Sequence, residues 1–213
     1  MVKPKVGIFV RHPYCSMQSC NGVIAALSES CSLSLFSTAP MEDSYFSKLD
    51  LVIFPGGFGH SDAFDFLLTH NSNAIREYVS KSGRYLGICL GAYWASSHYF
   101  DILDSVSVTQ YIKSPTSCTL RPHAKDMKVL WNSVPKTMFF YDGPTFSGEG
   151  NYSTISTYPN SDPMAIIQGR IGLIGCHPEA QEFWYSSYSY LSSKFIDRSS
   201  ELRSFTFDLL KNT

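Results

Sequence analysis

One cysteine in this sequence stands in a setting that suits nucleophilic chemistry. Cys89 lies in Tyr85-Leu-Gly-Ile-Cys-Leu-Gly-Ala-Tyr-Trp94, where an apolar run leads into Gly-x-Cys-x-Gly and an apolar helical stretch follows. This order is that of a nucleophile elbow with sulfur in place of a serine hydroxyl. We expect Gly87 and Gly91 to be required, because a Cβ at either would collide with the neighbouring strand or helix. A helix N-terminus also favours the thiolate, the reactive form of the side chain. The alternative is a buried core cysteine, a common place for a free thiol.

A histidine follows a second apolar run in Ile174-Gly-Cys-His-Pro-Glu179. His177 would then lie at the carboxyl end of a strand, the edge where open α/β sheets bind ligands and where Cys89 is also expected. Glu179 could orient the imidazole and fix its tautomer, as an acid does in a hydrolytic triad. Cys176 should point away into the core, since neighbours on a strand face opposite sides. A lone histidine before a proline is otherwise an ordinary loop residue.

Backbone donors are offered by a third segment, Phe54-Pro-Gly-Gly57, again at a predicted strand end. The N–H groups of Gly57 and of Leu90 could form an oxyanion hole beside the cysteine, although Pro-Gly-Gly alone indicates only a turn. Gly56 would then lie at the substrate pocket. The chain order of Gly-Gly, Gly-x-Cys-x-Gly and His-x-Glu is much more specific than any of its parts.

Other polar residues are weaker candidates for lining the substrate pocket. Tyr141 and Asp142 could line it, but a hairpin turn explains Asp-Gly equally well. Arg11 and His12 follow the first predicted strand at the same edge and could contact a ligand or be solvated loop residues. The remaining histidines have no metal-ligand spacing, so we expect neither a metal nor a cofactor; they include His60, His98 and His123.

The elements that must position these residues alternate between strands and helices over the first half of the chain. This alternation predicts a mostly parallel sheet with helices on both faces. Asp62 is a plausible N-cap of a helix ending near Ser82, with Gly83 at C′. The expected strands are 6–10, 32–36, 51–54, 84–88 and 171–176, the first and last of them buried, with helices at 22–28 and 92–99.

After residue 99 the pattern changes to short apolar runs separated by Gly, Pro, Asn and Asp. These runs predict antiparallel strands added to the parallel core. We expect them at 106–110, 129–131, 138–141, 153–158 and 164–168, followed by helices at 183–195 and 201–210. Without a repeat or linker, residues 1–213 are expected to form a single domain.

Composition excludes several classes of protein. The 213 residues carry 17 Lys and Arg against 18 Asp and Glu, a net charge of −1, which argues against a nucleic-acid-binding surface. No apolar run is long enough to span a membrane, and the N-terminus has no signal-peptide pattern. The six cysteines have no C-x-x-C spacing, so we expect reduced thiols in a cytoplasmic protein.

Together the three segments resemble the class I glutamine amidotransferase-like superfamily, whose fold is a flavodoxin-like α/β sandwich. The resemblance spans roughly residues 6–179. It implies Cys89 as nucleophile, His177 as general base, Glu179 as its orienting partner, and Gly57 and Leu90 as oxyanion donors. The Gly-Ala-Tyr continuation after the cysteine, Tyr141-Asp-Gly-Pro-Thr-Phe146 and Gly175-Cys-His-Pro-Glu179 look most like the N-terminal domain of biotin-protein ligases in a free-standing form.

The resemblance implies a thiol enzyme acting on an amide C–N bond of a small molecule or peptide, with a separate ligase or synthase chain as a possible partner. Glutamine-using members usually continue the elbow with His-Gln, where this chain has Ala92-Tyr93, so free glutamine is not the expected substrate. Tyr93 would instead line the pocket. The chain lacks the adenylate loop of a ligase, so we expect no biotin transfer from it alone. The alternative is a non-catalytic ligand-binding or regulatory module, because fold alone cannot assign activity.

Overall fold

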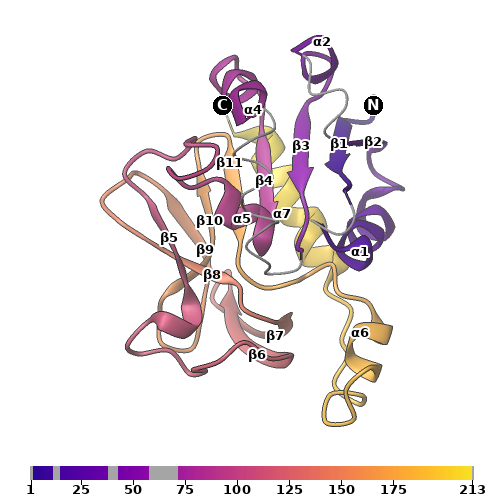
Figure 1. Ribbon diagram of the computed structural model, residues 1–213. Coiled ribbons are helices and arrows are strands. Elements are labelled where there is room, and N and C mark those ends of the chain that lie inside the picture. The colour runs from indigo at the N-terminus through magenta and orange to yellow at the C-terminus, as the bar shows by residue number, and fades with distance from the viewer. Residues whose placement is uncertain (1, 12–14, 38–42, 58–71, 213) are drawn as a thin grey trace.

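The computed structural model describes residues 2–11, 15–37, 43–57 and 72–212. A nine-stranded sheet, ordered β2-β1-β3-β4-β11-β10-β9-β6-β7, runs through the molecule (Figure 1). Its first five strands are parallel, as expected from the alternation of strands and helices. They are β2 (Ser32–Phe36), β1 (Lys5–Phe9), β3 (Leu51–Phe54), β4 (Tyr85–Ile88) and β11 (Ile171–Ile174).

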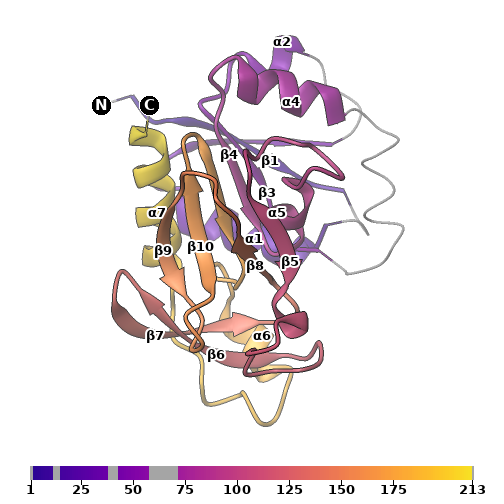
Figure 2. The same ribbon diagram turned by 90° about the vertical axis from the view of Figure 1, so that its left-hand side faces the viewer.

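Four antiparallel strands extend this sheet beyond β11, which confirms the predicted change of pattern. They are β10 (Pro163–Gln168), β9 (Ser153–Thr157), β6 (Lys125–Trp131) and β7 (Val134–Phe140). A separate two-stranded sheet pairs β5 (Ser107–Gln110) with β8 (Pro144–Ser147), and a 3₁₀ turn (Tyr111–Lys113) follows β5. Figure 2 shows β5 and β8 beside β9 and β10, and the β6–β7 pair crossing below them.

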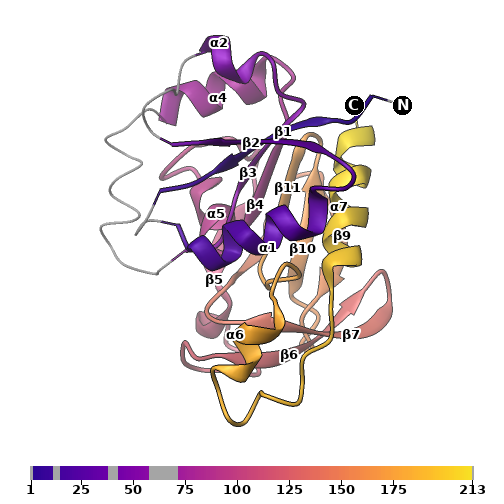
Figure 3. The same cartoon turned by 90° about the vertical axis from the view of Figure 1, so that its right-hand side faces the viewer.

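Helices cover both faces of the parallel strands. Figure 3 shows α1 (Met17–Leu27) and α7 (Ser199–Lys211) side by side on one face, and they contact each other. On the other face lie α4 (Ser72–Ser80) and α5 (Leu90–Trp94), with the short α2 (Asp43–Phe46) beside α4. A short α6 (Glu182–Ser186) lies near β6 and β7.

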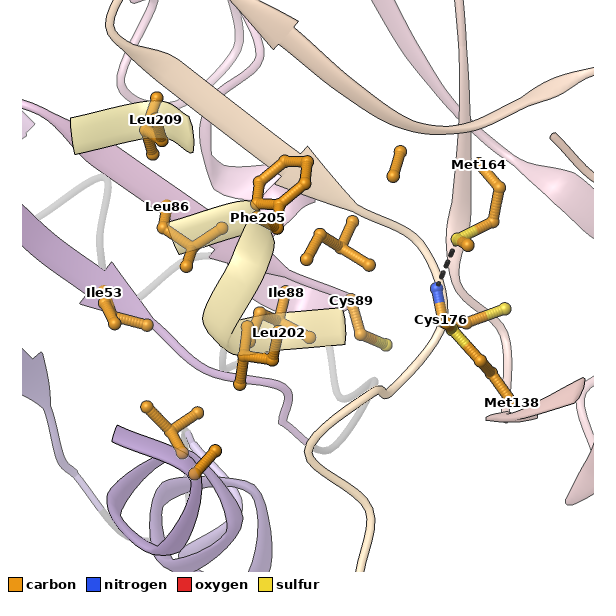
Figure 4. Packing of buried hydrophobic residues seen from close by; sticks show 14 of the residues in the cluster. Ile53, Leu86, Ile88, Cys89, Met138, Met164, Cys176, Leu202, Phe205 and Leu209 are labelled. Atoms are coloured by element: carbon orange, nitrogen blue, oxygen red, sulfur yellow. Dashed lines mark hydrogen bonds between the residues drawn. The ribbon is translucent and has the colours of Figure 1, made fainter. Parts of the chain in front are cut away.

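Alternate side chains of the parallel strands supply two separate cores. On β3, Ile53 packs in the cluster with α1 and α7, while Val52 and Phe54 pack in the cluster with α4 and α5. Because both faces are buried, these strands read as continuous apolar runs in the sequence. Figure 4 shows the first cluster, with Leu202 and Phe205 of α7 close to Ile88 at the end of β4.

Two predicted helices are shorter in the structure. The stretch 92–99 is helical only as part of α5, which ends at Trp94, and 183–195 contains only α6 followed by turns. The predicted N-cap Asp62 lies outside the described residues.

The end of α4 also differs from the prediction. Ser82, not Gly83, takes the left-handed backbone conformation, with φ +80°, and the Gly83 N–H donates to Tyr78 O at 2.9 Å. Gly83 is therefore the C″ residue of a Schellman turn. A Cβ there would lie about 2.5 Å from ring atoms of Tyr78. No helix in the described part of the chain is long and apolar enough to cross a membrane.

Candidate functional site

Cys89 occupies a sharp turn between β4 and α5. Its backbone has φ +50° and ψ −105°, a region that non-glycine residues rarely adopt and that costs on the order of 1–3 kcal/mol. The Cys89 N–H donates to Ile174 O at 2.8 Å, which ties the turn to the end of the neighbouring strand β11. This strained turn is the conformation expected of a nucleophile elbow.

Both glycines of the elbow are sterically required, as the sequence predicted. A Cβ on Gly87 would lie 2.6 Å from the carbonyl carbon of Gly91, and a Cβ on Gly91 would lie 2.6 Å from the carbonyl carbon of Phe54. Contacts this short do not occur at real Cβ atoms. The thiol itself is 8% exposed, so the alternative of a buried cysteine fits its exposed fraction but not its backbone strain.

His177 follows β11, the strand that pairs with β4. Its N–H donates to Phe139 O at 2.8 Å, and its ring lies 5.2 Å from that of Trp184. Its Nδ1 lies 2.8 Å from Oε1 of the buried Glu179. This leaves Nε2 as the ring nitrogen available to a reacting group.

The charge state of His177 depends on its neighbours. Burial by itself lowers the pKa of the imidazole, but negative charge on Cys89 and on Glu179, together with hydrogen bonds to both, raises it to about 10. A protonated His177 is therefore favoured while Cys89 and Glu179 carry negative charge. A thiolate beside an imidazolium is the reactive state of a thiol nucleophile.

Ser19 of α1 completes this arrangement, and sequence reasoning missed it. Its hydroxyl donates to Glu179 Oε1 at 2.6 Å and accepts the N–H of Gly56 at 2.9 Å. Ser19 is fully buried, so it links helix α1, the loop after β3 and the acid. The predicted helix began only at residue 22, whereas α1 begins at Met17, so no signal in the sequence placed Ser19 on a helix face.

Two glycines let these groups approach. A Cβ on Gly56 would lie 2.5 Å from His177 Cε1, so this residue makes room for the imidazole. A Cβ on Gly22 would lie 3.1 Å from the carbonyl carbon of Glu179. Gly56 was expected at the substrate pocket and does line the cavity, but its clearest role is to accommodate His177.

A cavity of about 940 Å³ opens at the carboxyl ends of β3, β4 and β11. Cys89, His177, Gly57 and Leu90 all line it, whereas Glu179 lies behind His177. Within the described residues, neither the Gly57 N–H nor the Leu90 N–H donates to a backbone carbonyl in the turns and loops. Their role as oxyanion donors stays a prediction.

Of the weaker candidates, Tyr93, Tyr141 and Asp142 also line this cavity. β7 and β8 pair with different strands, so Asp142-Gly143 is not the turn of a hairpin between them. Arg11 is exposed and is not among the described lining residues. His12 lies outside the described residues.

Further lining residues carry no signal in the sequence that would place them at a site. Trp184 packs against Phe139, and both Trp184 and Tyr188 reach the cavity. Tyr99, Gln110 and Phe139 line it too.

Cys176 points into the core, as predicted, and is fully buried. Its N–H donates to the sulfur of Met164 at 3.3 Å, the dashed line in Figure 4. Among the described residues, no group of three or more His, Cys, Asp or Glu side chains could hold a metal ion.

Solved structures share this arrangement of strands and helices. A glutamine amidotransferase from Thermotoga maritima matches with a TM-score of 0.64 at 16% identity over 100% of both chains. A glutamine amidotransferase from Methylobacillus flagellatus matches with a TM-score of 0.59 at 14% identity, over 99% of this chain and 93% of the other. The fold is that of the class I glutamine amidotransferases.

Sequence comparison adds a second relation. Residues 16–108 match the family described as biotin-protein ligase, N terminal. This segment contains Ser19, the Gly56-Gly57 loop and the elbow, and it ends before His177. No curated protein matches the chain significantly. The predicted fold is therefore confirmed, and the likeness to the biotin-protein ligase N-terminal family is confirmed over residues 16–108. The chemistry of the site is a separate question.

Proposed function

We propose that this chain is a thiol hydrolase of the amidotransferase type, acting on an amide C–N bond through Cys89, His177 and Glu179. The observation that carries the proposal is the pairing of a strained Cys89 with a histidine whose pKa is raised by that same cysteine, at the wall of one cavity. A structural cysteine needs neither the strain nor the charged neighbour.

The reaction would begin from the thiolate–imidazolium pair. The Cys89 sulfur attacks the amide carbonyl carbon, a C–S bond forms, and the developing oxyanion accepts N–H donors from Gly57 and Leu90. His177 then gives its proton to the leaving nitrogen, the C–N bond breaks, and an amine departs. A thioester remains on Cys89.

Resolution of the thioester reverses the role of His177. The neutral imidazole takes a proton from water, which attacks the carbonyl carbon, and the C–S bond breaks to give a carboxylic acid and the thiolate. An amine in place of water would give amide transfer. Glu179 holds Nδ1 throughout, and Ser19 holds Glu179.

The test is covalent trapping of an acyl group, read by intact mass and peptide mapping. With activated acyl esters and a panel of amides, we expect a thioester at Cys89 that decays with release of acid. Cys89→Ser should lose the thioester while its melting temperature stays within a few degrees, since the side chains are similar in size. Cys118→Ser, at the exposed cysteine, is the matched control and should acylate normally.

Two results would contradict the proposal. One is acylation unaffected by His177→Asn, and the other is a complete lack of thioester with every acyl donor in a well-folded protein. The second would favour a ligand-binding or regulatory module. A separate ligase or synthase chain as amine donor or partner stays a prediction.

A further inference from the structure

The cavity beside Cys89 is poor in positive charge. No lysine or arginine is among its described lining residues, and the segments outside the described part of the chain contain none in their sequence. Among the described residues, the ionisable groups at the cavity other than its tyrosines are Cys89, Asp142, His98 and His177, with Glu179 behind His177. The acidic side chains there are opposed by two histidines and by no described lysine or arginine.

Asp142 is held rigidly at this wall. Its backbone has φ +101°, strained for a residue with a side chain, and its carbonyl accepts a hydrogen bond from the Tyr93 hydroxyl at 3.1 Å. The amide of Gln110, also a lining residue, donates to Oδ2 at 3.0 Å. The hydrogen bond from α5 thus positions the backbone of Asp142, and the one from β5 positions its carboxylate.

The same carboxylate is short of partners. Its Oδ1 is buried and has no hydrogen-bond partner among the described residues. Burial raises the pKa of Asp142, while Gln110 and the exposed Lys113, which is not a described lining residue, oppose this. A carboxylate in this position would gain most from a cationic or N–H donor group on a ligand.

Asp142 and Cys89 both act on the Tyr93 side chain, which lines the same cavity. Burial raises the pKa of Tyr93, and negative charges on both Cys89 and Asp142 raise it further, so the phenol lies within electrostatic range of both. Aromatic faces complete the wall, from Tyr93, Tyr99, Phe139, Tyr141, Trp184 and Tyr188. Such faces attract a desolvated cation and are neutral toward apolar groups.

We propose that the amide substrate of this site carries a protonated amine, received beside Asp142 and the aromatic wall, and not a carboxylate. This inference rests on the proposed function only in calling the ligand a substrate. The preference for a positively charged ligand is a property of the cavity and can be tested by binding alone.

The experiment measures binding to the Cys89→Ser protein, which cannot form the thioester. The probes are 4-(aminomethyl)benzamide, 4-(hydroxymethyl)benzamide and 4-carboxybenzamide, which share an aromatic amide and differ in charge. Isothermal titration is run at pH 7.5 with low and high salt. We expect the cationic probe to bind at least about tenfold more tightly than the neutral one, the anionic probe to bind most weakly, and salt to reduce the difference.

Two substitutions, each removing one carboxylate, show which residue causes the preference for the cationic probe. Asp142→Asn should bring the cationic and neutral probes to within about twofold of each other. Asp126→Asn is the matched control, because Asp126 also has a buried, unpartnered Oδ1 but does not line the cavity. It alters the net charge equally and should leave the preference intact.

Several results would overturn the inference: equal binding of the cationic and neutral probes, tightest binding of the anion, no binding of the cationic probe, or a preference that survives Asp142→Asn. The probe panel on the Cys89→Ser protein decides this even if Asp142→Asn fails to fold. Selective binding without any Cys89 thioester would leave this inference standing and contradict the hydrolase proposal. A thioester formed without charge preference would do the reverse.

Discussion

Cys89 should be the most reactive of the six cysteines. It combines a strained backbone, a position at the cavity and an adjacent histidine whose pKa is raised to about 10. A hydrogen bond from Cys20 lowers the pKa of Cys15 against the effect of burial, but Cys15 is fully buried. With substoichiometric iodoacetamide at neutral pH, peptide mapping should show Cys89 labelled at least about tenfold faster than the exposed Cys118. Preferential labelling of Cys15 or Cys118 would count against this assignment.

His177 should remain protonated well above neutral pH. Its pKa of about 10 exceeds the ordinary 6.5, so the stability contributed by its charge is complete below about pH 6.5 and is lost as the pH rises through 10. Imidazole ¹⁵N shifts should show a doubly protonated ring at pH 8. In Cys89→Ser the neighbouring negative charge is removed, so the pKa should fall. A neutral His177 ring at pH 8 in the unmodified protein would contradict the ion pair.

Ser19 should act as a positioning residue for Glu179. Ser19→Ala removes the donor to Glu179 Oε1 and the acceptor of the Gly56 N–H, which should cost about 1–3 kcal/mol of folding free energy. If the role goes beyond stability, the pH profile of Cys89 alkylation should also shift, because Glu179 would hold His177 less firmly. A neighbouring change, Gln18→Ala, gives the comparison, since Gln18 also lies on α1 and lines the cavity but is exposed. An unchanged profile in Ser19→Ala would reduce Ser19 to a packing residue.

The contrast between Cys89 and Ser19 shows which site residues can be predicted from residue types and spacing. The elbow is predictable because its glycines and its thiol lie within five neighbouring positions, where the local backbone decides the geometry. Ser19 contacts a residue 160 positions away, and a serine in a helix has no local feature that reveals such a contact. The acid was predictable only because Glu179 stands two residues from His177.

At the level of elements, α1 owes its position to a glycine that disfavours the helix. Gly22→Ala would raise helix propensity by about 1 kcal/mol, yet the new Cβ would press on the backbone of Glu179. We expect a net loss of about 1–3 kcal/mol in urea unfolding. Asn21→Ala, at the adjacent exposed position, should instead gain about 0.5 kcal/mol. Equal gains from both changes would mean that α1 does not need this close approach.

Strands were easier to predict than helix lengths. The parallel strands β3 and β4 are buried on both faces, and an apolar run bounded by turn residues identifies them. The stretch 183–195 is rich in aromatic residues, but after α6 its side chains serve a small separate core with Phe139 and the cavity wall. Tertiary contacts, which a local pattern does not contain, end the helix there.

At the level of the whole molecule, two parts of the chain line the cavity. The parallel half supplies Cys89, His177, Gly57 and Leu90, whereas β5, β7 and the β7–β8 loop supply Gln110, Phe139 and Asp142. The match to the biotin-protein ligase N-terminal family ends at residue 108 and covers mainly the parallel half. We therefore expect substrate selectivity to depend on the part of the chain that lies mostly beyond this match.

Free glutamine should be a poor substrate. Its α-carboxylate would enter a cavity without lysine or arginine among the described lining residues, and beside Asp142 it would meet a like charge. A site whose polar groups do not match a substrate discriminates against it by several kcal/mol. Tyr93 also stands where glutamine-using relatives carry other side chains, so ammonia release from millimolar glutamine should stay near background.

The decisive test of this prediction compares glutamine with glutaminamide. Glutaminamide keeps the side-chain amide and the ammonium group but replaces the α-carboxylate with a neutral amide. If the missing counter-charge is what excludes glutamine, glutaminamide should be hydrolysed faster than glutamine by the unmodified protein, and Asp142→Asn should narrow the gap. Steady, Cys89-dependent ammonia release from glutamine at a rate equal to that from glutaminamide would contradict the prediction. An ordinary glutaminase would then be the better description, because the cavity would have accepted a carboxylate with no cation to receive it.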